Sequence, residues 1–523
     1  MRRMIFATAL RGLLVGVALA APAAAYADTT LRIALPSDIR STDPGVNRDG
    51  NTDWVVSHIV EGLVGHRDDA SVGPMLAESY TISPDGKTYT FRLRSGITFQ
   101  NGKPMTSADV AWVWNRYMDA KTSWRCFTEF DGSKGLKVEK VDTPDDMTVV
   151  FQLNQPNSLF LANMARPDCG QTGIYQKESV GADGKWVKPI GTGPFQLAKR
   201  EPGRYVELDK FAGYKARSEP KSGLIGDKTP KVDHVRFLVV PDSSAAKAGF
   251  LTGDIDVLFD VENQDVAELK TNPEVKLDEV PGFGIVGYLF QTKDPVLGDV
   301  RMREAIKLSL DAPQIVDAVT VGLAKPNQSV IPPGSAFYSK IMATPFEPNI
   351  EKAKQLVKQA GYNGKPVMIM ASKQQPQLFE MAVMAQAMLA QIGVNSDIEV
   401  LDWATQLDRY NAGKFQMMAF SYSARLDPAL SYDMMAGDKA EQPRKVWDNP
   451  EQRKLLAETM ATADDKKRQA LFDQIETMFQ KDVPMIPLYS GARVGAVRKN
   501  IDGYASWSVG SPRAWGVSVT AAK

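Results

Sequence analysis

Few residues of this chain could make or break covalent bonds, and their spacing matches no catalytic site. The three histidines, His58, His66 and His234, show no metal-ligand spacing, and the sequence contains no G-x-S-x-G elbow, P-loop or C-x-x-C pair. Residues 282–287 satisfy G-x-G-x-x-G, but the continuation from Tyr288 is typical of a strand, whereas a dinucleotide site needs a helix there. The sequence therefore predicts a protein that is not an enzyme and holds no metal and no cofactor.

The N-terminus has the pattern of a secretory signal peptide. Arg2 and Arg3 precede an uncharged apolar run at residues 12–25, and the small-residue pattern at 25–27 predicts cleavage before Asp28. The run is shorter than the ~20 apolar residues of a membrane-spanning helix, and no second run of that length follows. The signal region also lacks a cysteine that could carry a lipid. We expect a periplasmic protein that is not a lipoprotein.

The chain has two cysteines, Cys126 and Cys169. An even count in an oxidising compartment predicts a disulfide between them. Closing a loop of that length would stabilise the fold by roughly 3 to 4 kcal/mol. Two buried free thiols are the alternative.

The charge composition argues against a protein that binds nucleic acid or an anionic membrane surface. Basic and acidic residues number 62 each, and 24% charged with 43% apolar residues is ordinary for a globular protein. Without residues 1–27 the formal charge is about minus three, so no basic surface is predicted. The remaining length suits two or three domains.

The elements that must position any site alternate between strands and helices. Residues 77–82 and 87–94 have two-residue periodicity and are joined by the Asp85-Gly86 turn, which predicts a β-hairpin. Similar patterns and capping residues predict strands at 31–35 and 396–401, and helices at 52–63, 106–117, 350–360 and 378–392. Helix-strand units of this kind are typical of α/β domains. Because no low-complexity linker divides the chain, the domains are predicted to be interleaved.

One long block of sequence carries a family resemblance. It consists of P-M-L-A-E-S-Y at 74–80, S-P-D-G-K-T-Y-T-F-R-L-R at 83–94, G-I-T-F at 96–99, N-G at 101–102 and A-D-V at 108–110. Shorter matches are E-G-L at 61–63, G-T-G-P-F at 191–195, L-T-G-D-I-D at 251–256, V-R-M-R-E-A-I at 300–306, and A-K-Q-L leading to A-G-Y at 353–362. On these residues the chain resembles the large extracytoplasmic solute-binding proteins of the oligopeptide, dipeptide and nickel type, solute-binding family 5.

The resemblance implies an α/β fold of two lobes, the type II periplasmic-binding-protein fold in its large cluster C form. An extra subdomain is inserted in lobe I, and the lobes close on ligand about a hinge. The implied division is signal peptide 1–27, lobe I 28–70, inserted subdomain 71–184, lobe I again 185–280, lobe II 281–487, and a return to lobe I at 488–523. The crossings between lobes are expected near residues 284–290 and 484–488.

The segment at residues 420–428, F-S-Y-S-A-R-L-D-P, corresponds to the lobe II segment that faces ligand in peptide-binding members. In those members an aspartate three residues before the acidic residue of the acidic-Pro pair holds the free amino group of the peptide. Here that position is Ala424, so the sequence departs from the pattern at the anchoring charge. Arg425 stands beside it and could hold a carboxylate or phosphonate. Its alternative role is to pair with Asp427 or to pack the loop.

Aromatic residues complete the candidate ligand site. Tyr422 could form an aromatic wall, or could be a core aromatic of a strand. The further candidate ligand contacts are Asp427, Trp403, Trp54 and Arg40. His58 could bind metal, since some members of the family carry nickel complexes, or could be a surface or core-edge residue.

The resemblance implies the periplasmic substrate-binding component of an ABC-type importer. It would bind a small peptide-like or carboxylated compound and deliver it, as a monomer, to a permease and its ATPase subunits. Free-amine peptides and acidic or N-blocked compounds remain alternatives for the ligand. A periplasmic sensing or chaperone-like binding protein is an alternative function, as is a periplasmic hydrolase or oxidoreductase.

Overall fold

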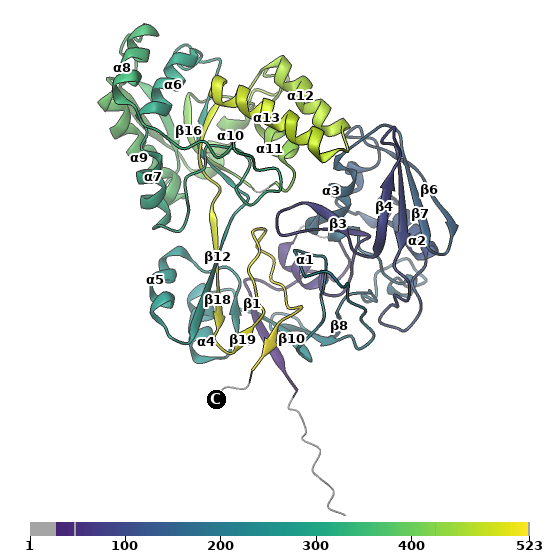
Figure 1. Cartoon of the computed structure of the whole chain (residues 1–523). Helices are drawn as coiled ribbons and strands as arrows, with labels where there is room; N and C mark the ends of the chain where they lie inside the picture. Colours follow the sequence, from purple (N-terminus) through teal and green to yellow (C-terminus); the bar gives the residue numbers. More distant parts are fainter. Residues whose placement is uncertain (1–27, 47–48, 424, 521–523) are drawn as a thin grey trace, which may run out of the picture.

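The computed structural model describes residues 28–46, 49–423 and 425–520. The predicted signal peptide at 1–27 and Ala424 lie outside these ranges. Within them the chain forms two α/β lobes, and a smaller β-rich subdomain lies beside them (Figure 1). The α/β class predicted from the sequence is confirmed.

The lobe I sheet has seven strands drawn from both halves of the chain. Its strand order is β12 (Val275–Pro281), β18 (Ala492–Arg498), β11 (Val257–Leu258), β1 (Thr30–Leu35), β10 (His234–Val239), β9 (Tyr205–Lys210) and β8 (Phe195–Glu201). β1 runs parallel to β10 and β11, while β18 runs antiparallel to β11 and β12. The carboxyl ends of β1, β10 and β11 therefore meet at one edge, where α/β sheets commonly bind ligands.

The lobe II sheet has five strands. Their order is β15 (Ser396–Val400), β14 (Val367–Ala371), β16 (Met417–Tyr422), β13 (Ile285–Phe290) and β17 (Met485–Tyr489). β14 runs parallel to β15 and β16, whereas β13 is antiparallel to β16 and β17. Every residue of β13 is buried, as expected for an inner strand covered on both faces.

The inserted subdomain is an antiparallel sheet of β4 (Ala77–Ile82), β5 (Thr88–Leu93), β7 (Thr148–Leu153) and β6 (Val138–Asp145), in that order. Residues alternate between buried and accessible along β5 and β7, so one face of the sheet packs on a core. In that core the ring of Phe151 meets Phe91 at 5.7 Å and Trp114 at 5.0 Å between centroids. Two short antiparallel pairs join β2 (Val64–His66) to β3 (Val72–Pro74), and β19 (Ile501–Asp502) to β20 (Ser518–Val519).

Helices flank each sheet. In lobe I, α4 (Ser243–Thr252) packs against β11, and α5 (Asn263–Thr271) against β12 and β18. In lobe II, α9 (Pro376–Gln391) packs against β14, β15 and β16. The other α-helices are α1 (Gly50–Val56), α2 (Ser107–Tyr117), α3 (Leu159–Ala165), α6 (Val300–Ser309), α7 (Ala312–Thr320), α8 (Ile350–Gln359), α10 (Trp403–Asn411), α11 (Pro428–Met435), α12 (Pro450–Ala461) and α13 (Asp465–Asp482). Over the described ranges, no helix has the length and apolar character that a membrane crossing requires.

The chain crosses between the two large sheets twice. It leaves the lobe I sheet at Pro281, where β12 ends, and enters the lobe II sheet at Ile285. It returns between Tyr489, the end of β17, and Ala492, the start of β18. The crossings lie side by side because Pro281 is paired with Ala492 across the β12–β18 ladder. The domain boundaries given above stay a prediction.

Several predicted elements are confirmed. β4 and β5 form the predicted antiparallel hairpin, and Gly86 in its turn has a φ of +70°. The helix predicted from residue 106 begins with a capping box between Thr106 and Asp109. The glycine-rich stretch at 282–287 runs into strand β13, so it has no helix to support a dinucleotide site.

The helix predicted at residues 52–63 is wrong in extent, because α1 ends at Val56. The carbonyl of His58 accepts the backbone N–H of Phe195 at 3.1 Å, and the carbonyl of Ile59 accepts that of Gly193 at 2.9 Å. A neighbouring segment thus uses carbonyl groups that a longer helix would have engaged.

Candidate functional site

A cavity of about 1010 Å³ lies between lobe I and lobe II. In lobe I its lining follows the carboxyl ends of β1, β10 and β11, at residues 34–36, 240–247 and 258–269. In lobe II it is lined by the end of α7, the start of α9 and Ser421 on β16. The two crossings border it through Val286 and Tyr489. Both sheets thus direct the carboxyl ends of parallel strands into one space, which makes this interlobe cavity the candidate ligand site.

An aromatic pair forms part of the lobe I wall of the interlobe cavity. Trp54 on α1 and Phe259 after β11 both line it, and their rings meet edge to face at 4.7 Å between centroids. Asp49 fixes the start of α1 by accepting the backbone N–H groups of Asn51 and Thr52. The candidate Trp54 therefore sits in a position to contact a ligand, together with Phe259, which the sequence did not single out.

Carboxylates outnumber cations in the lining of the interlobe cavity. Asp260, Glu262, Asp265 and Glu380 line it, and Lys247 is the single lysine or arginine among its described lining residues. Lys247 is itself engaged by Asp265 at 2.7 Å. Burial raises the pKa of the Asp260 carboxyl. Asp260 is also paired with Arg493 at 2.8 Å. The lining itself has four carboxylates against one lysine, which suits a cationic group.

Tyr422 and Trp403 belong to the aromatic core of lobe II. Tyr422 is 6% exposed, and its hydroxyl lies 3.1 Å from that of Tyr410. Burial raises the pKa of the Tyr422 phenol. Trp403, half-buried at the start of α10, stacks on Phe420 at 5.7 Å between centroids. These two candidates support the strand that carries Ser421 into the cavity.

Arg425 lies on the loop between β16 and α11. Its Nη1 donates a hydrogen bond to the Ser423 hydroxyl at 2.9 Å. Burial lowers the pKa of the Arg425 guanidinium, and the charge of Arg166 on the inserted subdomain lowers it further, while Asp168 opposes the shift. Arg425 is therefore on the side of lobe II that faces the inserted subdomain.

Asp427 is committed to the interior of lobe II. Its carboxylate accepts two hydrogen bonds from Nη2 of Arg468, at 2.8 and 2.9 Å, and caps α11 through the backbone N–H of Ala429. Asp427 is 7% exposed. Arg468 therefore engages this carboxylate, and the predicted alternative of an Arg425–Asp427 pair stays a prediction.

The inserted subdomain contacts lobe II away from the crossings. Ser158 donates its backbone N–H to the carbonyl of Met460 at 2.7 Å and its hydroxyl to the carbonyl of Thr459 at 2.8 Å. A second cavity of about 300 Å³ adjoins this contact, and Tyr80 and Asp427 are among its lining residues. The inserted subdomain and lobe II are thus linked by a non-covalent contact with its own cavity.

Arg40 lies on the loop that follows β1. Its side chain is exposed, and its backbone N–H donates to the Thr52 hydroxyl at 3.0 Å. That bond fixes the loop against α1, next to Trp54. Arg40 itself is not among the residues lining the interlobe cavity.

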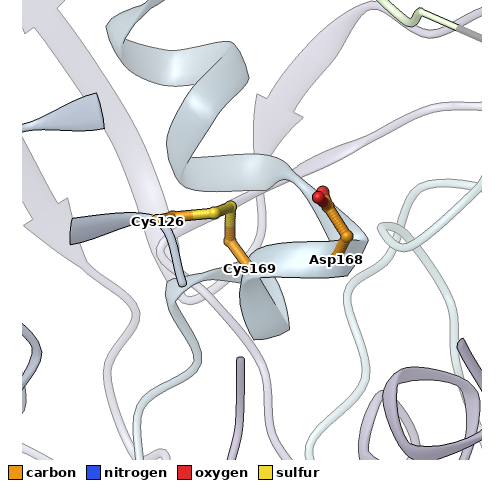
Figure 2. A group of neighbouring side chains, drawn as sticks. All are labelled: Cys126, Asp168 and Cys169. Atoms are coloured by element: carbon orange, nitrogen blue, oxygen red, sulfur yellow. A yellow bond between two sulfur atoms is a disulfide. The ribbon is translucent and has the colours of Figure 1, made fainter. Parts of the chain in front are cut away.

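Cys126 and Cys169 are joined by a disulfide (Figure 2). Asp168 lies next to them, and its carboxylate and the two sulfurs fall within 4.8 Å of one another. Sulfurs bonded to each other offer no thiolate to a metal ion. The Asp168 carboxylate is paired with Arg166 at 2.7 Å. We therefore interpret this cluster as a disulfide cross-link that stabilises the inserted subdomain.

His58 is fully buried in lobe I. Its Nδ1 lies 2.8 Å from the carbonyl of Trp54, and its Nε2 accepts the backbone N–H of Ala514 at 3.0 Å. Burial lowers the pKa of His58 to about 3. The ring thus ties α1 to the C-terminal segment and has no nitrogen left for a metal.

The comparisons with known proteins decide the family. A sequence profile of the bacterial extracellular solute-binding proteins, family 5, matches residues 71–443. The chain belongs to this family. The predicted family, the two-lobed fold and the class of solute-binding protein are confirmed.

Family 5 relatives span nearly the whole chain. The glutathione-binding protein GsiB of Escherichia coli strain K12 is 27% identical over 517 residues, covering 96% of this chain and 97% of that protein. The structure of HbpA2 from Haemophilus parasuis is 26% identical, covers 94% of this chain and 100% of that one, and has a TM-score of 0.81. DppA from Helicobacter pylori in complex with the peptide STSA is also 26% identical, covers 94% and 98%, and has a TM-score of 0.67.

Among the described residues of the segment at 420–428, Ser421 alone lines the interlobe cavity, so the ligand role of this segment stays a prediction. Phe259, Asp260 and Gln377 line the cavity and were missed. They follow the carboxyl end of β11 or begin α9. The signal that could have found them is the strand-end rule applied to both predicted sheets.

Proposed function

We propose that this family 5 protein is the periplasmic substrate-binding component of an ABC-type importer. It captures a small peptide-like or carboxylated ligand in the interlobe cavity and delivers it to a membrane permease with its ATPase subunits. The observation that carries this proposal is the cavity of about 1010 Å³ enclosed by both lobes. A site of that size, shared between two lobes joined by paired strands, suits reversible capture by hinge closure.

The names of the relatives support a peptide-like ligand. GsiB is named as a glutathione-binding protein, and DppA was solved with a four-residue peptide. In this chain the carboxylates around Asp260 and Glu262 could receive an ammonium group in place of the aspartate missing at residue 424. Arg425, at the side facing the inserted subdomain, would receive a carboxylate.

The fit to relatives also supports closure on ligand. HbpA2 and the DppA–peptide complex have the same identity to this chain, yet their TM-scores are 0.81 and 0.67. A different placement of whole lobes lowers such a score without changing the fold of either lobe. We infer that the described arrangement is the unliganded one, and that peptide binding rotates lobe II toward lobe I.

Location and oligomeric state follow from the same proposal. The signal pattern at residues 1–27 directs the chain to the periplasm, and the absence of a cysteine there removes the lipid attachment site. A substrate-binding component delivers one ligand per encounter with its permease, so a monomer suffices.

The test is a thermal-shift screen of the purified mature chain against three pools. These are free-amine di- to pentapeptides, glutathione and other γ-linked or N-acylated peptides, and small organic acids. Ligand at 100 times its dissociation constant adds about 2.7 kcal/mol to the free energy of unfolding. A shift confined to one pool assigns the ligand class, and isothermal titration with its members gives the affinity. If compounds of a pool are chemically altered on incubation with the protein, the importer assignment fails.

A further inference from the structure

A pocket of about 240 Å³ lies at the end of lobe II that is remote from the interlobe cavity. Val286, near the start of β13, lines the interlobe cavity, while Thr292, just past the end of the strand, lines this second space. The four residue steps from Val286 to Phe290 alone span about 13 Å of extended chain. The remote pocket is therefore a separate site.

A buried lysine opens on the remote pocket. Lys439 is 5% exposed, and its ammonium donates to the side-chain oxygen of Gln291 and, at 2.9 Å, to the hydroxyl of Thr292. Both partners are neutral, and no carboxylate of the described ranges lies within 4.0 Å of the ammonium. An ammonium carries three N–H donors, so one is left for the pocket.

A second buried cation lines the same pocket. Arg303 is 6% exposed and donates to the carbonyls of Leu297, Gly298, Asp482 and Val483. These four bonds leave one of its five N–H donors unused. Within the described chain no carboxylate lies within 4.0 Å of the Arg303 guanidinium, and the charges of Asp482 and Asp299 act on it from farther away.

Two carboxylates, Asp482 and Asp448, also line the remote pocket. Asp482 accepts hydrogen bonds from the Trp447 indole at 2.9 Å and from the Asn449 amide at 2.8 Å. Asp448 pairs with Arg453, and lies 3.7 Å from the exposed ammonium of Lys293. Three cations, Lys293, Arg303 and Lys439, line the pocket against these two carboxylates, so the lining keeps an excess of positive charge.

Two buried cations that line one pocket cost free energy unless enough counter-charge offsets them. We propose that the remote pocket binds a small oxyanion, a phosphate, sulfate or carboxylate group, between the ammonium of Lys439 and the guanidinium of Arg303. The anion uses the spare N–H donor of each and supplies the missing charge. Lys293 at the rim contributes to attraction from solvent. The site is independent of the ligand in the interlobe cavity.

The titration of Lys439 gives the site a pH signature. Burial lowers the pKa of Lys439 to about 8; the charges of Lys293 and Arg303 add to this shift, and the Asp448 carboxylate opposes it. A neutral amine no longer attracts an anion, so affinity for the oxyanion falls as the pH rises above about 8. An adventitious surface site built on ordinary lysines would hold its affinity to about pH 10.

The experiment compares thermal unfolding of the full mature chain in chloride with unfolding in sulfate, phosphate or acetate at matched ionic strength. Lys439→Met is the test variant. Lys445→Met is its matched control, because Lys445 is 2% exposed in the same loop region, its ammonium donates to the carbonyl of Asp433, and it is not among the residues lining the pocket. At ~100 times its dissociation constant, the anion should raise the unfolding midpoint of the wild type and of Lys445→Met by about 2 °C more than that of Lys439→Met.

Sulfate and phosphate also stabilise proteins generally by exclusion from the surface. Equal shifts in all three proteins would therefore overturn the proposal. If Lys439→Met does not fold, isothermal titration of the wild type with sodium phosphate at pH 7 and pH 9.5 decides: binding at pH 7 that is weakened at least 10-fold at pH 9.5 supports the site, and absence of binding at pH 7 rejects it. Comparing sulfate with acetate distinguishes a tetrahedral oxyanion from a carboxylate.

Discussion

Nη2 of Arg468 donates to both carboxylate oxygens of Asp427, at 2.8 and 2.9 Å, and both side chains are buried. This pair gives Asp427 a structural task. Asp427→Ala should lower the free energy of unfolding by about 3 to 5 kcal/mol, because it leaves the Arg468 charge buried without a partner. Calorimetry of both proteins measures the change. A loss of ligand affinity with unchanged stability would instead return Asp427 to the ligand site.

For Arg425 we expect substitution to change ligand affinity and not the stability of the fold. Arg425→Ala should weaken binding of a carboxylated ligand about 10- to 100-fold, because a charged hydrogen-bond pair is worth about 1.5 to 3 kcal/mol. The fold should be intact. Isothermal titration gives the affinity, and Arg301→Ala, which removes an exposed arginine paired with Asp299, is the control. Unchanged affinity for the acid would assign Arg425 to packing of its loop.

Trp54 is the aromatic candidate that lines the interlobe cavity. Trp54→Ala should weaken ligand binding about 30-fold, since buried aromatic anchors carry about 2 kcal/mol or more at binding sites. Trp186→Ala is the control, because Trp186 packs on Tyr175 in a separate part of the chain. Equal affinities of the wild type and Trp54→Ala would mean that the ligand sits away from the Trp54–Phe259 wall.

The buried, neutral His58 should make the free energy of unfolding depend on pH. Its pKa in the folded chain is about 3, below the ordinary value of about 6.5. The unfolded chain therefore takes up the proton first as the pH falls. The free energy of unfolding should drop between about pH 6.5 and pH 3, by up to about 1.4 kcal/mol per pH unit from this residue.

The difference in slope between the wild type and His58→Phe isolates this contribution from that of the carboxylates. The variant should be less stable at pH 7, because the N–H of Ala514 loses its acceptor, but its stability should fall less steeply with acid. Denaturant titrations at several pH values measure both slopes. Parallel slopes would contradict a buried, neutral His58.

The disulfide closes a loop with a sequence separation of 43 residues. Replacing Cys126 and Cys169 by serine should lower the free energy of unfolding by about 4 kcal/mol on the chain-entropy account. Melting of the variant against the wild type measures the loss. Mass analysis of the unreduced wild type should show no alkylatable thiol, and two free thiols would contradict the bond.

Much of the fold could be predicted because the sequence patterns that specify its elements are local and extend over several residues. The Asp85-Gly86 turn, the capping box at Thr106 and the uniformly apolar β13 each specify one element, and the family resemblance orders them. The end of α1 was not predictable, because it depends on hydrogen bonds from Gly193 and Phe195, more than 130 residues away. Propensity carries no information about such a partner.

The candidate site was harder to predict for the same reason. Trp54 lines the interlobe cavity, whereas Tyr422 and Asp427 are buried inside lobe II. Tyr422 lies next to Tyr410, and Asp427 is bonded to Arg468. Both contacts exist only in the folded lobe, so the sequence does not reveal them. At residue 424 the sequence has alanine where peptide-binding members have an aspartate, and this absent carboxylate was the clue to the ligand class. The positive charges that are present, on Lys439 and Arg303, meet only after strands and loops converge.

Strand β18 has one further consequence. It lies between β11 and β12 in the lobe I sheet, yet more than 200 residues separate it from β12 along the chain. A polypeptide emerging from its N-terminus thus keeps an unfilled gap in its first sheet until residue 498 is available. Long-range pairing of this kind is slow to form. The lobe I sheet therefore cannot be completed until nearly the whole chain has been made.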